Sequence, residues 1–283
     1  SLETISELAK RKKAPQKLIV VGCWPQLVGP QILQEVPSID ALLGTRRWME
    51  IGRLLERLQA AGKEKLVWLD DPADESSAHQ AGRILRCRPK SSAYLCIAEG
   101  CSASCAFCSI PNIKGKLCSR PMPEILEEAN YLVRYGAREL ILVAQDTTAY
   151  GLDRGERDAL PALLRQILSM TPELVWLRLM YAYPQHVTPQ LIATMAEEPR
   201  ICHYLDLPLQ HAHPQTLRRM RRPHNMSKVR HTLDALRAAM PDIALRTSFI
   251  VGYPGETEEE FCALLDFVEE IAFDKVGVFI FSR

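Results

Sequence analysis

The segment EGCSASCAFC, residues 99–108, places three cysteines in one loop at the spacing Cys-x3-Cys-x2-Cys. These are Cys101, Cys105 and Cys108, and the loop follows an apolar run at 94–98 that predicts a buried strand. Thiolates are soft ligands that select iron–sulfur clusters or zinc. Three ligands on a 4Fe–4S cluster leave one iron open to bind a small molecule. The spacing therefore predicts a cluster that takes part in chemistry.

Zinc is the alternative ligand for these cysteines. Structural zinc sites take four ligands, mostly as two separated pairs, and the fourth could come from Cys96 or Cys118. Cys96 falls within the predicted strand, where a packing role is simpler. The chain has nine cysteines, an odd number, and the tight grouping of three favours metal or redox chemistry over disulfides.

From residue 93 onward, the apolar pattern alternates between strands and helices. Strands are predicted at 94–98, 139–144, 175–181, 203–207, 244–251 and 275–281. Helices are predicted between them at 122–135, 159–169, 189–197, 227–239 and 258–270. Each repeat has the size of a βαβ unit. The expected fold is α/β, an open parallel (β/α)6 barrel of partial TIM type, with its chemistry at the carboxyl ends of the strands.

Residues 1–69 predict a separate, smaller α/β layer. Its expected elements are helices at 2–11, 29–35 and 48–60 and strands at 18–21 and 39–43. Residues 70–92 are rich in Asp, Pro and Ser and predict a linker, so the barrel is expected at 93–283. The chain opens inside an amphipathic helix and stops directly after an apolar strand. We therefore expect a fragment of a longer protein.

Composition and charge restrict the possible partners. The chain is 47% hydrophobic and 24% charged, which excludes a disordered class of protein. Its net charge of +1 gives no global attraction to nucleic acid or membranes, and no apolar stretch is long enough to span a bilayer, so a soluble, cytoplasmic protein is expected. A local basic patch could contact rRNA phosphates or be a solvated face, and it comprises Lys114, Lys116, Arg218, Arg219, Arg221 and Arg222.

The cysteine spacing, the aromatic Phe107 before the last cysteine and the position after the first barrel strand resemble the radical S-adenosylmethionine (SAM) superfamily. The resemblance implies that the open iron binds the amino and carboxylate groups of SAM. Electron transfer from the cluster would then cleave SAM to a 5′-deoxyadenosyl radical. An external electron donor is implied as well.

The same resemblance implies a set of residues around SAM. Gln145 or Asp146, after the second strand, would meet the amino group of the cofactor. The stretch from Ser248 to Glu256 is similar to the adenine-side motif Gly-x-Ile-x-Gly-x3-Glu, with Ser248 in place of the first glycine. The implied cofactor-binding residues are Phe107, Gln145, Asp146, Gln210, Ile250 and Gly252. No acid or base role is assigned to His211 or His213.

Further segments resemble the methylthiotransferase branch, in the form that acts on a ribosomal protein. They include 110–111, 145–147, 183–184, 205–212 and 220–223. The resemblance implies transfer of a methylthio group to the β-carbon of an aspartate in protein twelve of the small ribosomal subunit. A radical suits that reaction, since this C–H bond has no proton acidic enough for a base. The alternatives are a tRNA adenosine methylthiotransferase, a non-catalytic iron–sulfur protein and an inactive truncated scaffold.

The amino-terminal layer also matches this branch. There it holds a second 4Fe–4S cluster on three cysteines, and Cys23, expected at the end of the first strand, is the one counterpart present here. The alternative for Cys23 is a buried thiol at a strand end.

Overall fold

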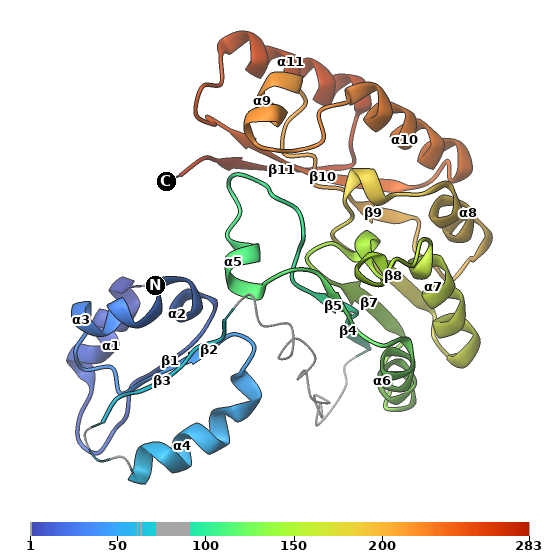
Figure 1. Cartoon of the computed structure of the whole chain (residues 1–283). Coiled ribbons are helices and arrows are strands. Elements are labelled where there is room, and N and C mark those ends of the chain that lie inside the picture. The colour runs from blue at the N-terminus through green and yellow to red at the C-terminus, as the bar shows by residue number, and fades with distance from the viewer. Residues whose placement is uncertain (1, 61, 63, 72–90, 283) are drawn as a thin grey trace. The chain divides into compact units, whose positions relative to one another are not determined.

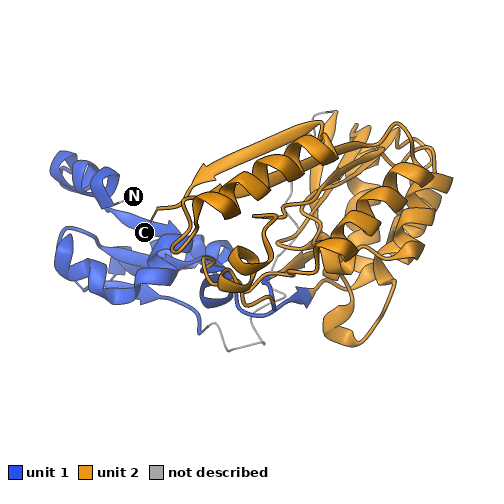
Figure 2. Ribbon diagram, turned by 90° about the horizontal axis from the view of Figure 1, so that it is seen from above, with its two compact units in different colours: residues 1–84, 100–102, 109–118 blue, residues 85–99, 103–108, 119–283 orange. Residues whose placement is uncertain are grey.

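The computed structural model describes residues 2–60, 62, 64–71 and 91–282. The chain divides into two compact units (Figure 2). The first comprises residues 1–84, 100–102 and 109–118, and the second comprises residues 85–99, 103–108 and 119–283. Two pieces around the cysteine loop thus pack with the amino-terminal unit, which a boundary drawn along the sequence does not anticipate. Most of the predicted linker lies outside the described residues, and Ser92 already belongs to a strand.

The first unit is built on a parallel sheet in the order β1-β2-β3 (Figure 1). Its strands are β1 (Ile19–Gly22), β2 (Ala41–Gly44) and β3 (Leu66–Trp68). Its helices are α1 (Leu2–Arg11), α2 (Cys23–Val28), α3 (Ile32–Glu35), α4 (Ile51–Ala60) and α5 (Ile110–Lys114), with 3-10 turns η1 (Gly29–Gln31) and η2 (Trp48–Glu50). The predicted strands of this layer are confirmed within two residues, and so is the first helix. The helices predicted at 29–35 and 48–60 each begin with a three-residue 3-10 turn, so their α-helical parts start at Ile32 and Ile51.

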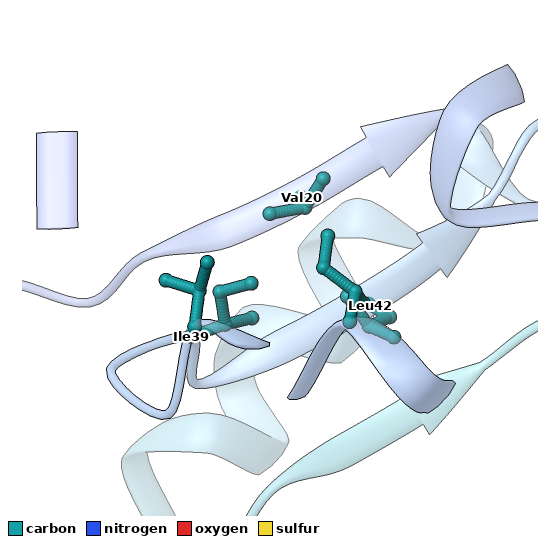
Figure 3. Close-up of a cluster of buried hydrophobic side chains, with 5 residues drawn as sticks. Val20, Ile39 and Leu42 are labelled. Atoms are coloured by element: carbon teal, nitrogen blue, oxygen red, sulfur yellow. The ribbon is translucent and has the colours of Figure 1, made fainter. Parts of the chain in front are cut away.

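Both faces of this sheet are covered by apolar side chains. Successive residues of a strand point to opposite faces, so Leu42 of β2 faces one side while Ala41 and Leu43 face the other. Leu42 packs in a cluster with Val20 and Ile39 (Figure 3). The other face packs against α4 through residues that include Leu54 and Leu58. Burial on both faces is what a parallel sheet requires.

The described part of the second unit contains six parallel strands in two three-stranded sheets, ordered β4-β7-β8 and β9-β10-β11. Between the two sheets, Leu177 of β8 forms a parallel bridge with Ile201, three residues before β9. The strands are β4 (Ser92–Cys96), β7 (Glu139–Val143), β8 (Trp176–Leu179), β9 (Tyr204–Asp206), β10 (Ala244–Val251) and β11 (Lys275–Ile280). Short strands β5 (Ala98–Glu99) and β6 (Cys118–Ser119) flank the cysteine loop.

Helices follow these strands on the outside of the sheet (Figure 1). They are α6 (Met122–Arg134), α7 (Ala159–Met170), α8 (Pro189–Glu197), α9 (Pro214–Arg219), α10 (Met226–Ala239) and α11 (Glu258–Ile271), with 3-10 turns η4 (Thr147–Ala149), η5 (Leu152–Arg154) and η6 (Pro184–His186). The six predicted strands and five predicted helices are confirmed, as is the expected α/β class with a partial parallel barrel. The sequence pattern missed α2, α5, α9 and β3, which are too short to show a period.

The barrel sheet has an apolar face under the helices, and its opposite face carries two ion pairs. In β10, Leu245 and Phe249 are buried, and the Phe249 ring packs against Phe273. On the opposite face, Arg246 of β10 pairs with Asp206 of β9 at 2.7 Å between Nη1 and Oδ1. Arg178 and Glu139 form a similar pair at 2.8 Å on β8 and β7. The face that carries these two ion pairs is therefore the side of the sheet suited to a polar ligand.

None of the helices in the described part of the chain is both long and apolar enough to cross a membrane.

Candidate metal centre and cofactor site

The first cysteine of the loop is held by a glycine turn within the first unit. Gly100 has φ +73°, and a Cβ at this position would overlap the backbone oxygen of Lys116. The next amide, that of Cys101, donates to the carbonyl of Gly115 at 3.1 Å, at the end of α5. Only glycine permits both this conformation and this close approach. The backbone position of Cys101 is therefore set by its immediate neighbour in the sequence.

The other two cysteines belong to the second unit and share one turn. The amide of Cys108 donates to the carbonyl of Cys105 at 3.1 Å, with the half-buried Phe107 between them. The amide of Ala106 donates to the carbonyl of Met220 at 3.0 Å, which ties this turn to the end of α9. Cys101, Cys105 and Cys108 are partly exposed, and no described cysteine is in a disulfide. Accessible, unbridged thiols of this number suit an iron–sulfur cluster.

Within the described ranges, no three His, Cys, Asp or Glu side chains are grouped closely enough to hold a single metal ion. The fit of the cysteine loop to a cluster rests on its donor chemistry and on the surroundings of Cys105.

Arg222 lies beside Cys105, a neighbour that the sequence analysis missed. Its Nη1 is 3.8 Å from the Cys105 Sγ, and its Nη2 donates to the carbonyl of Pro208. The guanidinium also stacks over the ring of Tyr183, with 4.2 Å between the guanidinium carbon and the ring centroid. Cysteine binds metals as the thiolate, and a neighbouring cation stabilises that charge. The residues around Cys105 therefore fit a metal-bound sulfur.

The two acceptors predicted after β7 have different surroundings. Asp146 is buried, and its Oδ1 accepts from the hydroxyl of Thr148 at 2.6 Å and the amide of Ala149 at 3.2 Å. Its Oδ2 lies 2.7 Å from Nδ1 of His186. Gln145 is exposed. Both oxygens of Asp146 thus have partners within the protein, whereas Gln145 faces solvent.

A pocket beside His186 was not anticipated from the sequence. Its volume is about 430 Å³, and its walls come from the segments that lead into α7 and α8, among them Tyr150, Leu160 and Leu191. None of the residues predicted to bind the cofactor lines it. The pocket is therefore separate from the residues assigned to the cofactor.

Gln210 joins the segment after β9 to the strand β10. This residue has φ +75°; its amide donates to the carbonyl of Ser248, and its carbonyl accepts from the amide of Ile250, both at 2.8 Å. Gln210 and Ile250 were predicted from different segments of the sequence to bind the cofactor, and the structure places them next to each other. Gly252 has φ +71° and is exposed, and a Cβ there would meet no described atom within 4 Å. The backbone conformation thus favours glycine, and the space beside it is open.

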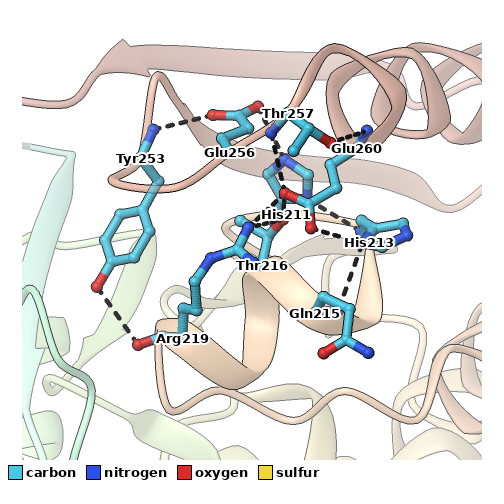
Figure 4. Close-up of polar contacts among 9 residues, drawn as sticks. All are labelled: His211, His213, Gln215, Thr216, Arg219, Tyr253, Glu256, Thr257 and Glu260. Atoms are coloured by element: carbon cyan, nitrogen blue, oxygen red, sulfur yellow. Dashed lines mark hydrogen bonds and ion pairs between the residues drawn. The ribbon is translucent and has the colours of Figure 1, made fainter.

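A buried histidine connects these two segments (Figure 4). The side chain of His211 is fully buried, and its Nδ1 accepts the amide of His213 at 2.9 Å. The proton of the neutral ring must therefore be on Nε2, which donates to Oε1 of Glu256 at 3.1 Å. The other oxygen of Glu256 accepts the amide of Tyr253 at 2.9 Å. Glu256 closes the turn that contains Gly252, so its role in this structure is to shape the loop.

We expect His211 to make the free energy of unfolding pH-dependent. Burial lowers the pKa of His211, and its hydrogen bond to Glu256 opposes part of that shift. The unfolded chain then binds the proton more readily, so the free energy of unfolding falls as the pH decreases below about 6.5. Urea unfolding between about pH 7.5 and 5.5 measures the effect. We expect a smaller dependence in His211→Gln and an unchanged one in His224→Gln, at an exposed position. An equal pH dependence in wild type and His211→Gln would contradict this assignment.

Two of the four arginines in the predicted basic patch, one exposed and one buried, have partners within the protein. Arg219 pairs with Glu260, and Arg222 contacts Cys105. Arg218 and Arg221 are exposed. Only these two of the four can present their full charge to a partner.

Cys23 is exposed at the first residue of α2, with its Sγ 3.7 Å from the hydroxyl oxygen of Thr45. The expectation of a position at a strand end was off by one residue, because β1 ends at Gly22. The alternative of a buried thiol is wrong for this residue.

Comparison with known proteins matches residues 95–268 to the Radical SAM superfamily. Along its whole length the chain is 45% identical to "Ribosomal protein uS12 methylthiotransferase RimO" of Roseiflexus sp. (strain RS-1) and 44% identical to the protein of that name from Geobacter sulfurreducens. It spans 63% of the length of each of these relatives.

Solved structures share the fold at low sequence identity. TsrM from Kitasatospora setae, a radical SAM methyltransferase solved with cobalamin and a [4Fe-4S] cluster, matches 99% of this chain and 59% of its own, with TM-score 0.67 and 13% identity. The cobalamin-dependent radical enzyme OxsB matches 95% of this chain and 41% of its own, with TM-score 0.63 and 13% identity. The family match covers more than half of the chain, including the cysteine loop and the barrel strands β7 to β10, and the chain therefore belongs to the radical SAM superfamily.

Proposed function

We propose that this chain is the central part of an enzyme that transfers a methylthio group to an aspartate of ribosomal protein uS12. The observation that carries the proposal is the Cys-x3-Cys-x2-Cys loop after the first strand of a parallel barrel, in a chain 44–45% identical over its whole length to relatives named for that reaction. The alternative substrate for the same methylthio transfer is a tRNA.

The superfamily works with a 4Fe–4S cluster and SAM, which together supply a one-electron cleavage of the cofactor when bound. We assign the cluster to three protein ligands, the thiolates of Cys101, Cys105 and Cys108. Cys23 is exposed, and we assign it to a second cluster in the longer protein, together with cysteines outside this chain. An external donor supplies the electron.

For the SAM site we propose Gln145 as the acceptor for the amino group. Gln145 is exposed after β7, while both oxygens of Asp146 have partners within the protein. Asp146 is then a positioning residue that holds the turn after β7. On the adenine side, Ile250 and Gln210 are joined by a backbone hydrogen bond, and Gly252 leaves open space beside them. Phe107 lies in the cysteine turn and packs near the cluster.

The substrate chemistry needs no general base. The β-carbon of aspartate has no acidic hydrogen, so the protein must hold the target rather than take a proton from it. His211 agrees with this, since both of its ring nitrogens are in hydrogen bonds that shape the loop. Arg218 and Arg221 are exposed cations suited to contact rRNA phosphates near the target.

Mass analysis of both candidate substrates tests the proposal. The full-length protein, reconstituted without oxygen, is incubated with SAM, a reductant and a sulfur source, and with either a peptide of uS12 or unmodified tRNA. We expect the peptide to gain a methylthio group at its aspartate and the tRNA to remain unchanged. A modified tRNA nucleoside would overturn the choice of substrate. 5′-Deoxyadenosine formation with neither substrate modified would overturn the transfer reaction.

A further inference from the structure

We propose that Arg222 supplies a fixed positive charge to the cluster through Cys105 and thereby raises its reduction potential. This proposal deepens the proposed function and depends on it for the presence of the cluster. Arg222 is a positioning residue here, because it acts through Cys105.

The position of Arg222 is set by the end of α9. The helix ends at Arg219, and Arg221 adopts a left-handed conformation with φ +53°. The amide of Arg222 donates to the carbonyl of Leu217 at 2.8 Å, and the amide of Arg221 to that of Arg218 at 3.0 Å. This pattern is a Schellman motif, and Pro223 directly after it prevents the helix from continuing. Arg222 therefore extends from a rigid turn, the same turn whose Met220 carbonyl holds Ala106.

The guanidinium is buried, and no acidic side chain among the described residues pairs with it. Arg222 is 8% exposed, and its contacts within the described part of the chain are the Tyr183 ring, the Pro208 carbonyl and the Cys105 sulfur. Its Nε is buried and has no hydrogen-bond partner among the residues that the structure describes. A buried charge without a counter-charge is strongly unfavourable. Among these neighbours, the sulfur of Cys105 is the one that can carry a negative charge.

A cluster on Cys105 would provide this missing counter-charge. Reduction adds one negative charge to the cluster, and a nearby cation stabilises the reduced form more than the oxidised form. Hydrogen bonds to the sulfurs and the local net charge are the features by which proteins set cluster potentials. Arg222 provides a hydrogen-bond donor and a positive charge at Cys105. Its removal should therefore make the cluster harder to reduce.

The test is a redox titration of the reconstituted chain, followed by electron paramagnetic resonance in the absence of SAM. The variants are Arg222→Met, which removes the charge, and Arg222→Lys, which keeps it without the planar fork. Arg218→Met is the matched control, an exposed arginine four residues away. We expect Arg222→Met to retain its iron and sulfide and to show a lower midpoint potential. Arg222→Lys should fall between this variant and wild type, and Arg218→Met should match wild type.

Two results would overturn the role of Arg222 while leaving the proposed function intact. One is a wild-type potential in Arg222→Met with a full cluster. The other is an equal shift in Arg222→Lys and Arg222→Met, which would indicate packing on Tyr183 rather than charge. If Arg222→Met does not assemble a cluster, Arg222→Gln gives the same comparison with a neutral donor retained. A wild-type chain that binds no cluster would instead refute the proposed function itself.

Discussion

Replacement of Cys101, Cys105 and Cys108 together by alanine is expected to remove the cluster iron from this chain and to abolish 5′-deoxyadenosine formation. Three thiolates are the whole protein ligand set proposed for the cluster, and alanine offers no donor atom. Because changes in the residues that merely orient metal ligands cost about 10–100-fold, loss of the ligands themselves should reduce turnover at least 100-fold. Anaerobic iron and sulfide analysis and chromatography of the products with SAM measure both effects.

The matched control is Cys262→Ala, an exposed cysteine on α11. It should retain full iron, sulfide and activity. Iron that is unchanged in the triple variant would reject the cluster assignment. Zinc in place of iron and sulfide in the wild-type chain would favour the structural zinc site instead.

The second large effect is expected at Glu260, at the start of α11. Its Oε2 pairs with Arg219 and accepts the hydroxyl of Thr216 at 3.1 Å and the amide of Thr257 at 3.1 Å (Figure 4). The hydroxyl of Thr257 in turn accepts the amide of Glu260 at 3.3 Å, so the two residues form a capping box. One buried carboxylate thus joins α9 to α11, next to the loop that contains Gly252.

Glu260→Gln should lower the free energy of unfolding by about 2 kcal/mol, the usual range for hydrogen bonds to a charged group. Urea unfolding of the two proteins measures the difference. Glu259→Gln is the control, because it removes the same charge from the same helix turn at an exposed position. It should cost less than about 1 kcal/mol, the contribution of a charge near a helix end. Equal losses in the two variants would show that the Arg219 contact adds nothing.

The effect of Glu260 should also depend on pH. Chiefly through its hydrogen bond with Arg219, the pKa of Glu260 is lowered to about 2 from an ordinary 4.5. Its contribution is therefore complete above about pH 4.5 and is lost as the pH falls toward 2. The stability difference between wild type and Glu260→Gln should shrink over that interval. A constant difference would contradict the shifted pKa.

The barrel was predictable because its signal is local. Apolar periodicity along helices such as α7 and α11, and short apolar runs in β7 and β10, depend only on residues close in the chain. The cysteine triad was equally predictable, because its three ligands fall within eight residues. Glu256 was harder. The motif marked it, but only the contact with His211, 45 residues away, shows that it shapes a loop.

Local patterns in the amino-acid sequence were enough to predict a parallel α/β barrel that presents three thiols after its first strand. Which polar residues have partners within the protein became visible only in the folded chain. Asp146 is held by His186, 40 residues later, and Cys105 meets Arg222, 117 residues later. Such pairs depend on how strands and helix ends pack in space, where burial requires each polar group to find a partner. No spacing along the chain encodes that requirement, so the cation beside Cys105 emerged only from the folded structure.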